Sequence, residues 1–208
     1  MTLYRDDALK ALIPHVRDTD IVVAVYQSCF DWLALNPRDL NYVAVGAMGQ
    51  ASSHGLGLAL ANPNRRVIVL DGDGSLLMNL GSLVSIAEAG VTNFYHFLSA
   101  NRVYEVNGSH PIPGGQVVDF ESLARSAGYA GSHSFSQLKA LTDGVADVLA
   151  LPGPQMSVLE LEAGQPYPRD YNYIHSAEAR AIFEDALNNP ITTGQGGTIQ
   201  GCEIPPRW

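Results

Sequence analysis

Cysteine is scarce in this sequence, and its scarcity excludes several kinds of site. Cys29 and Cys202 are the only two cysteines among 208 residues, so they form no Cys-x-x-Cys pair and cannot hold an iron–sulfur cluster. No base or cation lies near Cys29 in the sequence. We therefore expect a small buried apolar side chain there rather than a reactive thiol. This cysteine usage is typical of a reduced, cytoplasmic protein.

Positive charge is also in short supply. The chain carries 12 Lys and Arg against 21 Asp and Glu, which gives a formal net charge of −9. Nucleic-acid binding requires clustered Lys and Arg, and no basic run is present, so we expect no nucleic-acid partner. No apolar stretch reaches the length of a membrane span, and the first residues lack the charged and apolar regions of a signal peptide. We therefore expect no membrane partner.

Apolar runs alternate with helical patterns along the chain, without an internal repeat or a low-complexity linker. Strands are predicted at residues 21–25, 42–45, 67–70, 94–98, 132–135 and 157–161. Helices are predicted at residues 7–16, 50–61, 76–89, 119–127, 137–149 and 176–189. This alternation predicts an α/β fold, a doubly wound and mostly parallel sheet with helices on both faces. We place this domain at residues 1–163, followed by a C-terminal extension at 164–208 that is either a partner-wrapping arm or a disordered end.

The stretch from residue 65 to 108 organises the rest of the chain. An apolar run at 67–70 passes directly into Asp71-Gly72-Asp73-Gly74-Ser75, and a second apolar run ends just before Asn101. With a helical crossover between them, the two runs form a βαβ unit. Asp73 and Asn101 then fall at the carboxyl ends of parallel strands, where ligands bind in open α/β sheets.

The residues around Asp73 suggest a phosphate and a cation. Gly72 and Gly74 let the backbone turn sharply and approach a ligand closely, although a plain strand-to-helix turn explains these glycines equally well. We expect Ser75 to cap the following helix, whose first N–H groups favour a phosphate. A carboxylate beside bound phosphate needs a cation between them, and the oxygens of Asp73 and Asn101 suit Mg²⁺.

These motifs resemble those of a known family. A Gly-Asp-Gly-Ser stretch, followed roughly two dozen residues later by Asn at a strand end, resembles the diphosphate motif of thiamine diphosphate enzymes. The string at residues 72–83, GDGSLLMNLGSL, is similar to the small subunits of phosphonopyruvate and sulfopyruvate decarboxylases. Upstream, GAMG at residues 46–49 matches their Gly-x-Met-Gly stretch. The resemblance covers about residues 41–162, and it implies a thiamine diphosphate-binding fold.

The resemblance assigns roles to particular residues. Asp73 and Asn101 would bind Mg²⁺ through their side chains, and Val103 through its backbone carbonyl. Met48, which in isolation reads as a core methionine, would lie under the cofactor as an apolar wedge. One departure is visible, because the family usually has Asn where this chain has Ala100. The cofactor-binding residues implied are Gly46, Ala47, Met48, Gly72, Asp73, Gly74, Ser75, Asn101, Val103 and Tyr104.

Three residues are candidates for catalytic roles. His110 lies in the irregular stretch at 101–116 and could protonate the carbanion left by loss of CO₂, because His titrates near working pH. Glu105 is placed similarly. The alternatives are a solvated loop histidine and a surface carboxylate. In the resembling decarboxylases the loop reads Thr-Gly-Gly-Gln or Thr-Gly-Asn-Gln, and here either residues 107–110 or residues 113–116 correspond to it.

The helix predicted at residues 50–61 contains the third candidate, His54, which either contacts the cofactor or substrate or is a polar helix position. Glycine disfavours helix interiors by about 1 kcal/mol, so Gly55 and Gly57 predict close packing against the sheet or the cofactor.

The resemblance also implies a partner. Full-length relatives carry a second domain that grips the pyrimidine ring and supplies an activating Glu, and no such domain fits here. We therefore expect a diphosphate-binding subunit that is active only with a separate pyrimidine-binding (alpha) chain, most simply as α2β2 or a larger assembly. The expected reaction is decarboxylation of a small 2-oxo acid to an aldehyde and CO₂. The alternatives are a carboligase, a noncatalytic cofactor-binding or scaffold subunit, and, ranked lower, a ferredoxin-coupled oxidoreductase.

Overall fold

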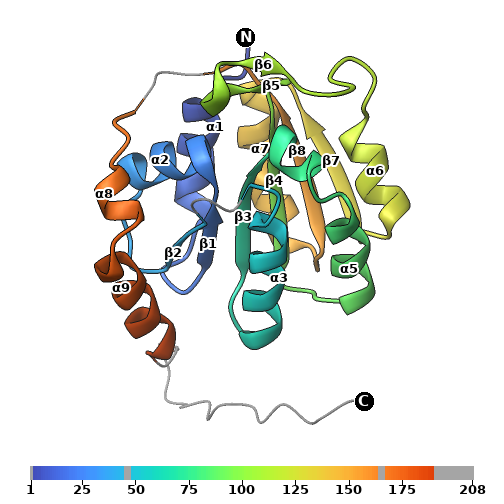
Figure 1. The fold of residues 1–208 in the computed structure, drawn as a ribbon. Coiled ribbons are helices and arrows are strands. Elements are labelled where there is room, and N and C mark those ends of the chain that lie inside the picture. The colour runs from blue at the N-terminus through green and yellow to red at the C-terminus, as the bar shows by residue number, and fades with distance from the viewer. Residues whose placement is uncertain (1, 45–47, 164–166, 190–208) are drawn as a thin grey trace.

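A parallel sheet of six strands forms the centre of the computed structural model, which describes residues 2–44, 48–163 and 167–189 (Figure 1). The strands are β1 (Ile21–Ala24), β2 (Asn41–Val43), β3 (Val67–Gly72), β4 (Phe94–Ala100), β7 (Gly131–Phe135) and β8 (Gln155–Glu160). They run in the order β2-β1-β3-β4-β8-β7, and every pair is parallel. The central strands β1 and β4 are buried throughout, and β3 is buried up to its last residue, as expected for strands covered on both faces.

Helices cover both faces of this sheet. Their bounds are α1 (Arg5–Leu12), α2 (Tyr26–Leu35), α3 (Ala51–Ala61), α4 (Asp73–Leu77), α5 (Gly81–Ala89), α6 (Phe120–Ala127), α7 (Leu138–Ala150), α8 (Tyr171–Ile174) and α9 (Ala177–Asn188). A short 3₁₀ turn, η1 (Ile13–His15), extends α1. Helices α1, α2 and α7 pack on one face around Leu9 and Val145, and α3, α5 and α6 pack on the other around Ala59 and Ile86. The predicted doubly wound α/β sheet is confirmed.

Burial explains one of the two cysteines that the sequence singled out. Cys29 of α2 is 1% exposed, and burial raises the pKa of its thiol to about 12, so it is the inert core side chain expected. Cys202 lies outside the described residues. Among the helices that the structure describes, none combines the length and the apolar composition that crossing a membrane requires.

The crossover between β3 and β4 differs from the single helix expected at residues 76–89. It consists of α4 and α5, separated by a turn in which Met78 N donates to Ser75 O (3.1 Å) and Asn79 N to Leu76 O (3.0 Å). Leu80, the residue directly before α5, is 36% exposed, whereas Ile86 of α5 is fully buried. The spacing of Leu76, Leu80, Leu83 and Ala87 predicts one buried apolar stripe along a single helix, and this prediction is wrong at Leu80.

The role expected for Ser75 as the helix cap is also wrong. Helix α4 begins two residues earlier, at Asp73, and its N-cap residue is Gly72. The Ser75 hydroxyl instead accepts a hydrogen bond from Gly49 N at 3.0 Å. This bond ties the turn that follows Met48 to α4.

The stretch at residues 101–116, expected to be irregular, contains a small hairpin. Its strands β5 (Val103–Tyr104) and β6 (His110–Pro111) are antiparallel, and the 3₁₀ turn η2 (Glu105–Asn107) lies between them. The chain can reverse here because Gly108 and Ser109 adopt φ angles of 81° and 56°, in the left-handed region. Ser109 N then donates to Tyr104 O at 2.9 Å and closes the turn.

Candidate functional site

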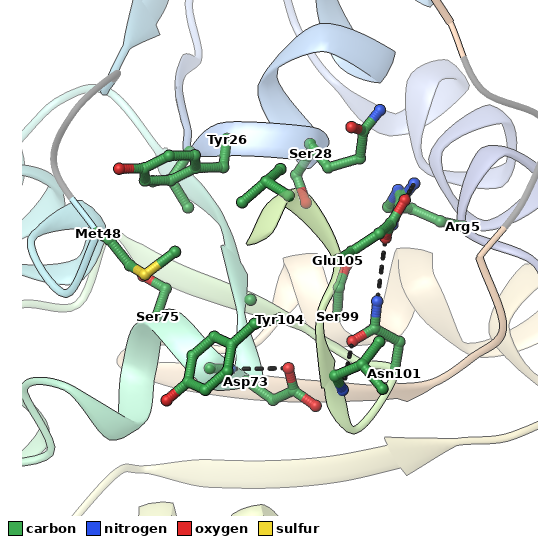
Figure 2. Close-up of a pocket in the computed structure, with 16 residues that line it drawn as sticks. Arg5, Tyr26, Ser28, Met48, Asp73, Ser75, Ser99, Asn101, Tyr104 and Glu105 are labelled. Atoms are coloured by element: carbon green, nitrogen blue, oxygen red, sulfur yellow. Dashed lines mark hydrogen bonds and ion pairs between the residues drawn. The ribbon is translucent and has the colours of Figure 1, made fainter. Parts of the chain in front are cut away.

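A cavity of about 60 Å³ lies at the carboxyl ends of β3 and β4 (Figure 2). This is the sheet edge at which the sequence placed the ligand. The strand ends, the first turn of α4, the start of α2 and the β5–η2 segment form its wall. The predicted site residues that line it are Met48, Gly72, Asp73, Gly74, Ser75, Asn101, Val103, Tyr104 and Glu105.

Asp73 is the first residue of α4 and is 2% exposed. Its Oδ1 accepts from Gly74 N at 2.7 Å, and its Oδ2 accepts from Arg102 N at 2.6 Å. The left-handed backbone of Arg102, with a φ of 65°, accompanies this second bond. Burial raises the pKa of Asp73 to about 6, even though both N–H groups act to lower it. The hydrogen bonds to this buried carboxylate thus come from neutral backbone groups, and a cation beside it would favour its charged form.

Asn101 follows directly after β4, and its side-chain amide is held at both ends. Its Oδ1 accepts from Val103 N at 3.2 Å, and its Nδ2 donates to Glu105 Oε2 at 3.0 Å. Since β3 and β4 are adjacent and parallel, with Gly72 in register with Ser99, the strand ends bring Asp73 and Asn101 to one cavity. The two oxygen-bearing side chains that the sequence paired are therefore brought together.

Tyr104 lies directly over the glycine that follows Asp73. A Cβ atom added to Gly74 would stand only 2.4 Å from Cε1 of the Tyr104 ring, so this position has no room for a side chain. Gly72 differs, because a Cβ atom there would meet nothing within 4 Å. Of the two motif glycines, Gly74 is thus the one that packing requires.

Comparison with known protein families identifies the domain. Residues 25–160, more than half of the chain, match the family described as thiamine pyrophosphate enzyme, C-terminal TPP binding domain. The chain belongs to this family. The expected cofactor, thiamine diphosphate (thiamine pyrophosphate, TPP), is the one for which this TPP-binding domain is named.

Individual relatives agree with the family. Phosphonopyruvate decarboxylase of Streptomyces viridochromogenes is 36% identical over 158 residues, which cover 76% of this chain and 39% of that protein. Sulfopyruvate decarboxylase subunit beta of Methanothermobacter thermautotrophicus is 33% identical over 184 residues, which cover 85% of this chain and 98% of that subunit. The chain thus spans about two fifths of the first relative and nearly all of the second.

A solved structure shows the same fold. The thiamine diphosphate-dependent 4-hydroxybenzoylformate decarboxylase of Rhodococcus jostii RHA1 superposes with a TM-score of 0.63 at 20% identity, covering 78% of this chain and 33% of that one. At this identity the likeness concerns the fold alone.

The residues of this TPP-binding domain fit a hard cation bridging to a diphosphate. In the described ranges no group of three or more His, Cys, Asp or Glu side chains could hold a metal by itself. Asp73 and Asn101 line the cavity with one carboxylate and one amide oxygen, which suits Mg²⁺, a cation held by few protein oxygens together with substrate phosphates. The buried carboxylate that lacks a charged hydrogen-bond donor is the observation that supports this fit.

Several predicted site residues lie elsewhere. His54 of α3 lines a separate cavity with Tyr42 and Phe183, and its Nδ1 has no hydrogen-bond partner in the described structure. His110 is exposed on β6, opposite Tyr104 in the hairpin, and is not among the residues that line the Asp73 cavity. The Pro113–Gln116 alternative for the decarboxylase loop does not line it either. Gly46 and Ala47 lie outside the described residues.

Glu105 is not the surface carboxylate that the sequence offered as an alternative to a catalytic role. Its side chain is 20% exposed and forms a bidentate ion pair with Arg5 of α1, at 2.5 Å from Nη1 to Oε2 and 3.0 Å from Nη2 to Oε1. Arg5, which is 2% exposed, also donates from Nε to Asp31 of α2 at 2.6 Å. Burial acts to lower the pKa of Arg5, but the bonds to these two carboxylates outweigh it and raise the pKa.

Sequence reasoning missed Arg5 and Asp31 altogether. Arg5 lies just before the helix predicted at residues 7–16, and Asp31 lies in α2, where no helix was predicted. The two residues are 26 positions apart, and the contact of Arg5 with Glu105 spans 100 residues. Nothing in the local pattern distinguishes them from surface charges of amphipathic helices. The sequence offered one signal for Arg5. Because Lys and Arg are few in this chain, an Arg beside a cluster of acidic residues is a candidate for a specific ion pair.

A buried polar chain lies behind the site. His96 of β4 is fully buried, with Nε2 at 3.3 Å from Asp71 Oδ2 and Nδ1 at 3.3 Å from the Tyr129 hydroxyl. Asp71 also accepts from Gly72 N at 2.8 Å through its other oxygen. The position of His96 inside the apolar run at residues 94–98 predicts a hydrogen-bonded core histidine, and the structure confirms this; His96 also supports the end of β3.

Proposed function

We propose that this chain is the diphosphate-binding subunit of a thiamine diphosphate-dependent decarboxylase that acts on a small 2-oxo acid, such as phosphonopyruvate or sulfopyruvate, and releases an aldehyde and CO₂. It works with a separate pyrimidine-binding chain that supplies the activating Glu, in an α2β2 or larger assembly. A cytoplasmic location and the division into residues 1–163 and 164–208 remain predictions.

One observation carries the proposal. Asp73 and Asn101 directly follow two adjacent parallel strands and line one cavity together with Met48 and Ser75, in a chain whose relatives are named decarboxylases. In the cofactor complex, Asp73, Asn101 and the Val103 carbonyl would hold Mg²⁺. Gly74 and Ser75 would contact the diphosphate, and Met48 would pack under the cofactor.

Two findings support the need for a second chain. The Methanothermobacter relative matched over 98% of its length is named as a beta subunit, so a chain of this extent operates there as one subunit of an enzyme. The cavity of about 60 Å³ is also much smaller than the roughly 300 to 1,000 Å³ of complete ligand pockets. A cavity of this size is expected if this chain forms one wall of a site that it shares with a second chain.

When bound, thiamine diphosphate supplies the electron sink for loss of CO₂. The chain's own residues position the cofactor and hold or transfer protons. Glu105 is held by Arg5 as a charged ion pair, which favours a positioning role over proton donation. His110 remains a candidate proton donor, because it is exposed on the hairpin that borders the cavity.

Calorimetric titration with thiamine diphosphate and Mg²⁺ tests the proposal. It is performed on the chain alone, on Asp73→Ala, and on the chain mixed with the product of the neighbouring gene. We expect binding that requires Asp73 and tightens with the second chain. Absence of binding in every mixture would overturn the proposal.

Turnover then separates the alternatives. The two-chain mixture is supplied with phosphonopyruvate or sulfopyruvate, with and without an aldehyde acceptor. Aldehyde and CO₂ as products support a decarboxylase, whereas a product that incorporates the acceptor identifies a carboligase. Tight cofactor binding without turnover of any 2-oxo acid would identify a noncatalytic subunit.

A further inference from the structure

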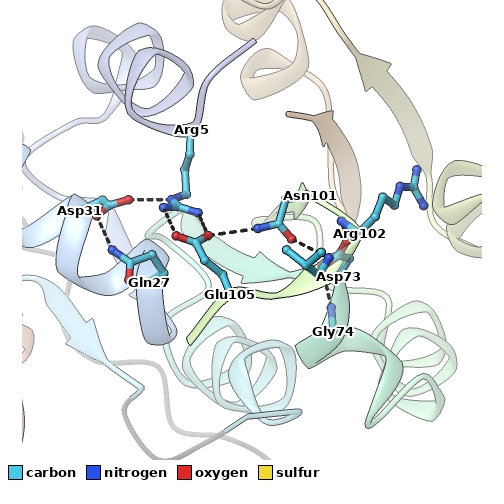
Figure 3. A network of polar contacts seen from close by, with 9 residues as sticks. Arg5, Gln27, Asp31, Asp73, Gly74, Asn101, Arg102 and Glu105 are labelled. Atoms are coloured by element: carbon cyan, nitrogen blue, oxygen red, sulfur yellow. Dashed lines mark hydrogen bonds and ion pairs between the residues drawn. The ribbon is translucent and has the colours of Figure 1, made fainter. Parts of the chain in front are cut away.

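We propose that Arg5 and Asp31 act through Glu105 as positioning residues that orient the Asn101 amide, so that its oxygen is presented to the cation (Figure 3). The inference rests on the proposed function, because it takes Asn101 as a cation ligand. It concerns residues outside the two sequence motifs, in α1, α2 and η2.

The relay begins with an arginine that two carboxylates hold in place. Arg5 binds Asp31 through Nε at 2.6 Å and grips both oxygens of Glu105, at 2.5 and 3.0 Å. Asp31 is fully buried and also accepts from Gln27 Nε2 at 2.8 Å. A planar guanidinium with both edges bonded fixes the position and the plane of the Glu105 carboxylate, which a lysine in its place would not do.

The fixed carboxylate then selects one of two amide orientations. The two ends of an Asn side chain are nearly equal in size, so packing alone does not choose between them. Glu105 Oε2 lies 3.0 Å from the Asn101 amide and can only accept, so the NH₂ end must face it. The carbonyl end is thereby turned to Val103 N, at 3.2 Å, on the side of the cavity.

Loss of Arg5, Asp31 or Glu105 should leave the Asn101 amide free to flip. Without Arg5, Asp31 and Glu105 become two uncompensated carboxylates, and Glu105, with its side chain 20% exposed, is the one that can move into water. With Gln at position 105, the side chain can donate as well as accept, so the flipped Asn101 amide becomes equally acceptable. Outer-shell partners of metal ligands typically change metal affinity by about 10- to 100-fold.

The test compares Glu105→Gln and Arg5→Lys with the wild-type chain. A matched control is Asp20→Asn, which breaks another buried ion pair, that of Asp20 with Arg66 at 2.5 Å, at the opposite end of the sheet.

The first measurement needs no cofactor. The Asn101 side-chain NH₂ resonance, assigned by its loss in Asn101→Asp, should be protected from solvent exchange in the wild type and in the control, and unprotected in both relay variants.

The second measurement is the Mg²⁺ dissociation constant at saturating thiamine diphosphate, by calorimetry with the partner chain present. We expect it to rise about 10- to 100-fold in the relay variants and to stay unchanged in Asp20→Asn. Should the relay variants keep the wild-type constant while Asn101→Ala abolishes binding, the relay is refuted and the proposed function stands. If Asn101→Ala or Asp73→Ala leaves Mg²⁺ binding intact, the proposed function fails with it. Equal weakening in the control also refutes the relay, since a general loss of stability then explains the effect.

Discussion

At the scale of single residues, Asp73 is placed where its charge costs stability. The carboxylate is 2% exposed and its hydrogen bonds come from two backbone N–H groups, so burial raises its pKa to about 6. A protein optimised for stability alone would have a neutral side chain, or one paired with an opposite charge, at this position. Binding sites commonly hold such strained charges, because the ligand offsets the cost.

The first prediction is a pH-dependent stability difference between the cofactor-free wild-type chain and Asp73→Asn. The pKa of Asp73 rises from 3.8 to about 6 on folding, so between these values the folded state holds the additional proton and loses stability as the pH rises. At about 1.36 kcal/mol per pKa unit, the wild type should lose roughly 3 kcal/mol relative to the variant across this window. Urea unfolding at several pH values measures the difference, and a constant difference would contradict the expectation.

The second prediction concerns the motif glycines. Gly74→Ala would put Cβ at 2.4 and 2.6 Å from two ring atoms of Tyr104, so the ring must move, at a cost of about 1–3 kcal/mol in the free energy of unfolding. Gly72→Ala is the matched control and should change stability by less than about 0.5 kcal/mol. Adding Tyr104→Ala should make the Gly74→Ala substitution nearly neutral, and an unchanged cost in that background would show that the clash is not its source.

At the scale of elements, the sequence predicted the strands and most helices because burial on two faces leaves a strong apolar signal. It failed where the chain changes direction inside an apolar pattern. The break between α4 and α5 depends on turn bonds at Met78 and Asn79 and on the Asn79 side chain, which donates to Ser53 of α3 at 3.2 Å. A tertiary contact of this kind does not alter the hydrophobic periodicity of the sequence, so the periodicity predicted a single helix.

Helix α3 shows the same limit for glycines. The sequence predicted close packing at both Gly55 and Gly57, and the structure confirms it for Gly55 alone. A Cβ atom at Gly55 would stand 2.4 Å from Val69 Cγ2 and 3.0 Å from the Phe94 ring, whereas at Gly57 it would meet nothing within 4 Å. Only the helix's rotation against β3, which composition does not encode, separates the two positions.

The third prediction follows from this pair. Gly55→Ala should lower the free energy of unfolding by about 1–3 kcal/mol, because α3 must move away from β3. Gly57→Ala should raise it by up to about 1 kcal/mol, since alanine replaces a glycine inside a helix at no steric cost. Thermal unfolding followed by circular dichroism measures both. Similar effects of the two substitutions would show that α3 does not pack as described.

At the scale of the whole molecule, the site was predictable only in part. Asp73 and Asn101 were predictable because topology alone brings the ends of adjacent parallel strands together. The Arg5–Glu105 pair was not, because a contact across 100 residues depends on how α1 packs beside the sheet. Of the catalytic candidates, Glu105 lines the Asp73 cavity, whereas His54 and His110 do not, since the position of a histidine in a loop or helix says little about which cavity it faces.

The C-terminal region raises the question of where the domain ends. The sequence placed residues 164–208 outside it, yet Phe183 of α9 is 7% exposed within the core cluster, and its ring packs edge-on against Tyr42 of the edge strand β2 at 5.2 Å between centroids. In Figure 1, α9 lies beside β2 at the open edge of the sheet. Such edges pair with other chains unless something covers them.

The last prediction is that Phe183→Ala destabilises the whole fold. Removing a buried ring should lower the free energy of unfolding by about 3 kcal/mol. The neighbouring exposed residue provides the control, because Glu184→Ala should change it by less than about 0.5 kcal/mol. Urea unfolding measures both variants, and light scattering of a 1–163 fragment tests whether the uncovered edge of β2 self-associates. A fragment as stable and as monomeric as the full chain, together with a neutral Phe183→Ala, would mean that the extension is a separate unit available for the partner chain.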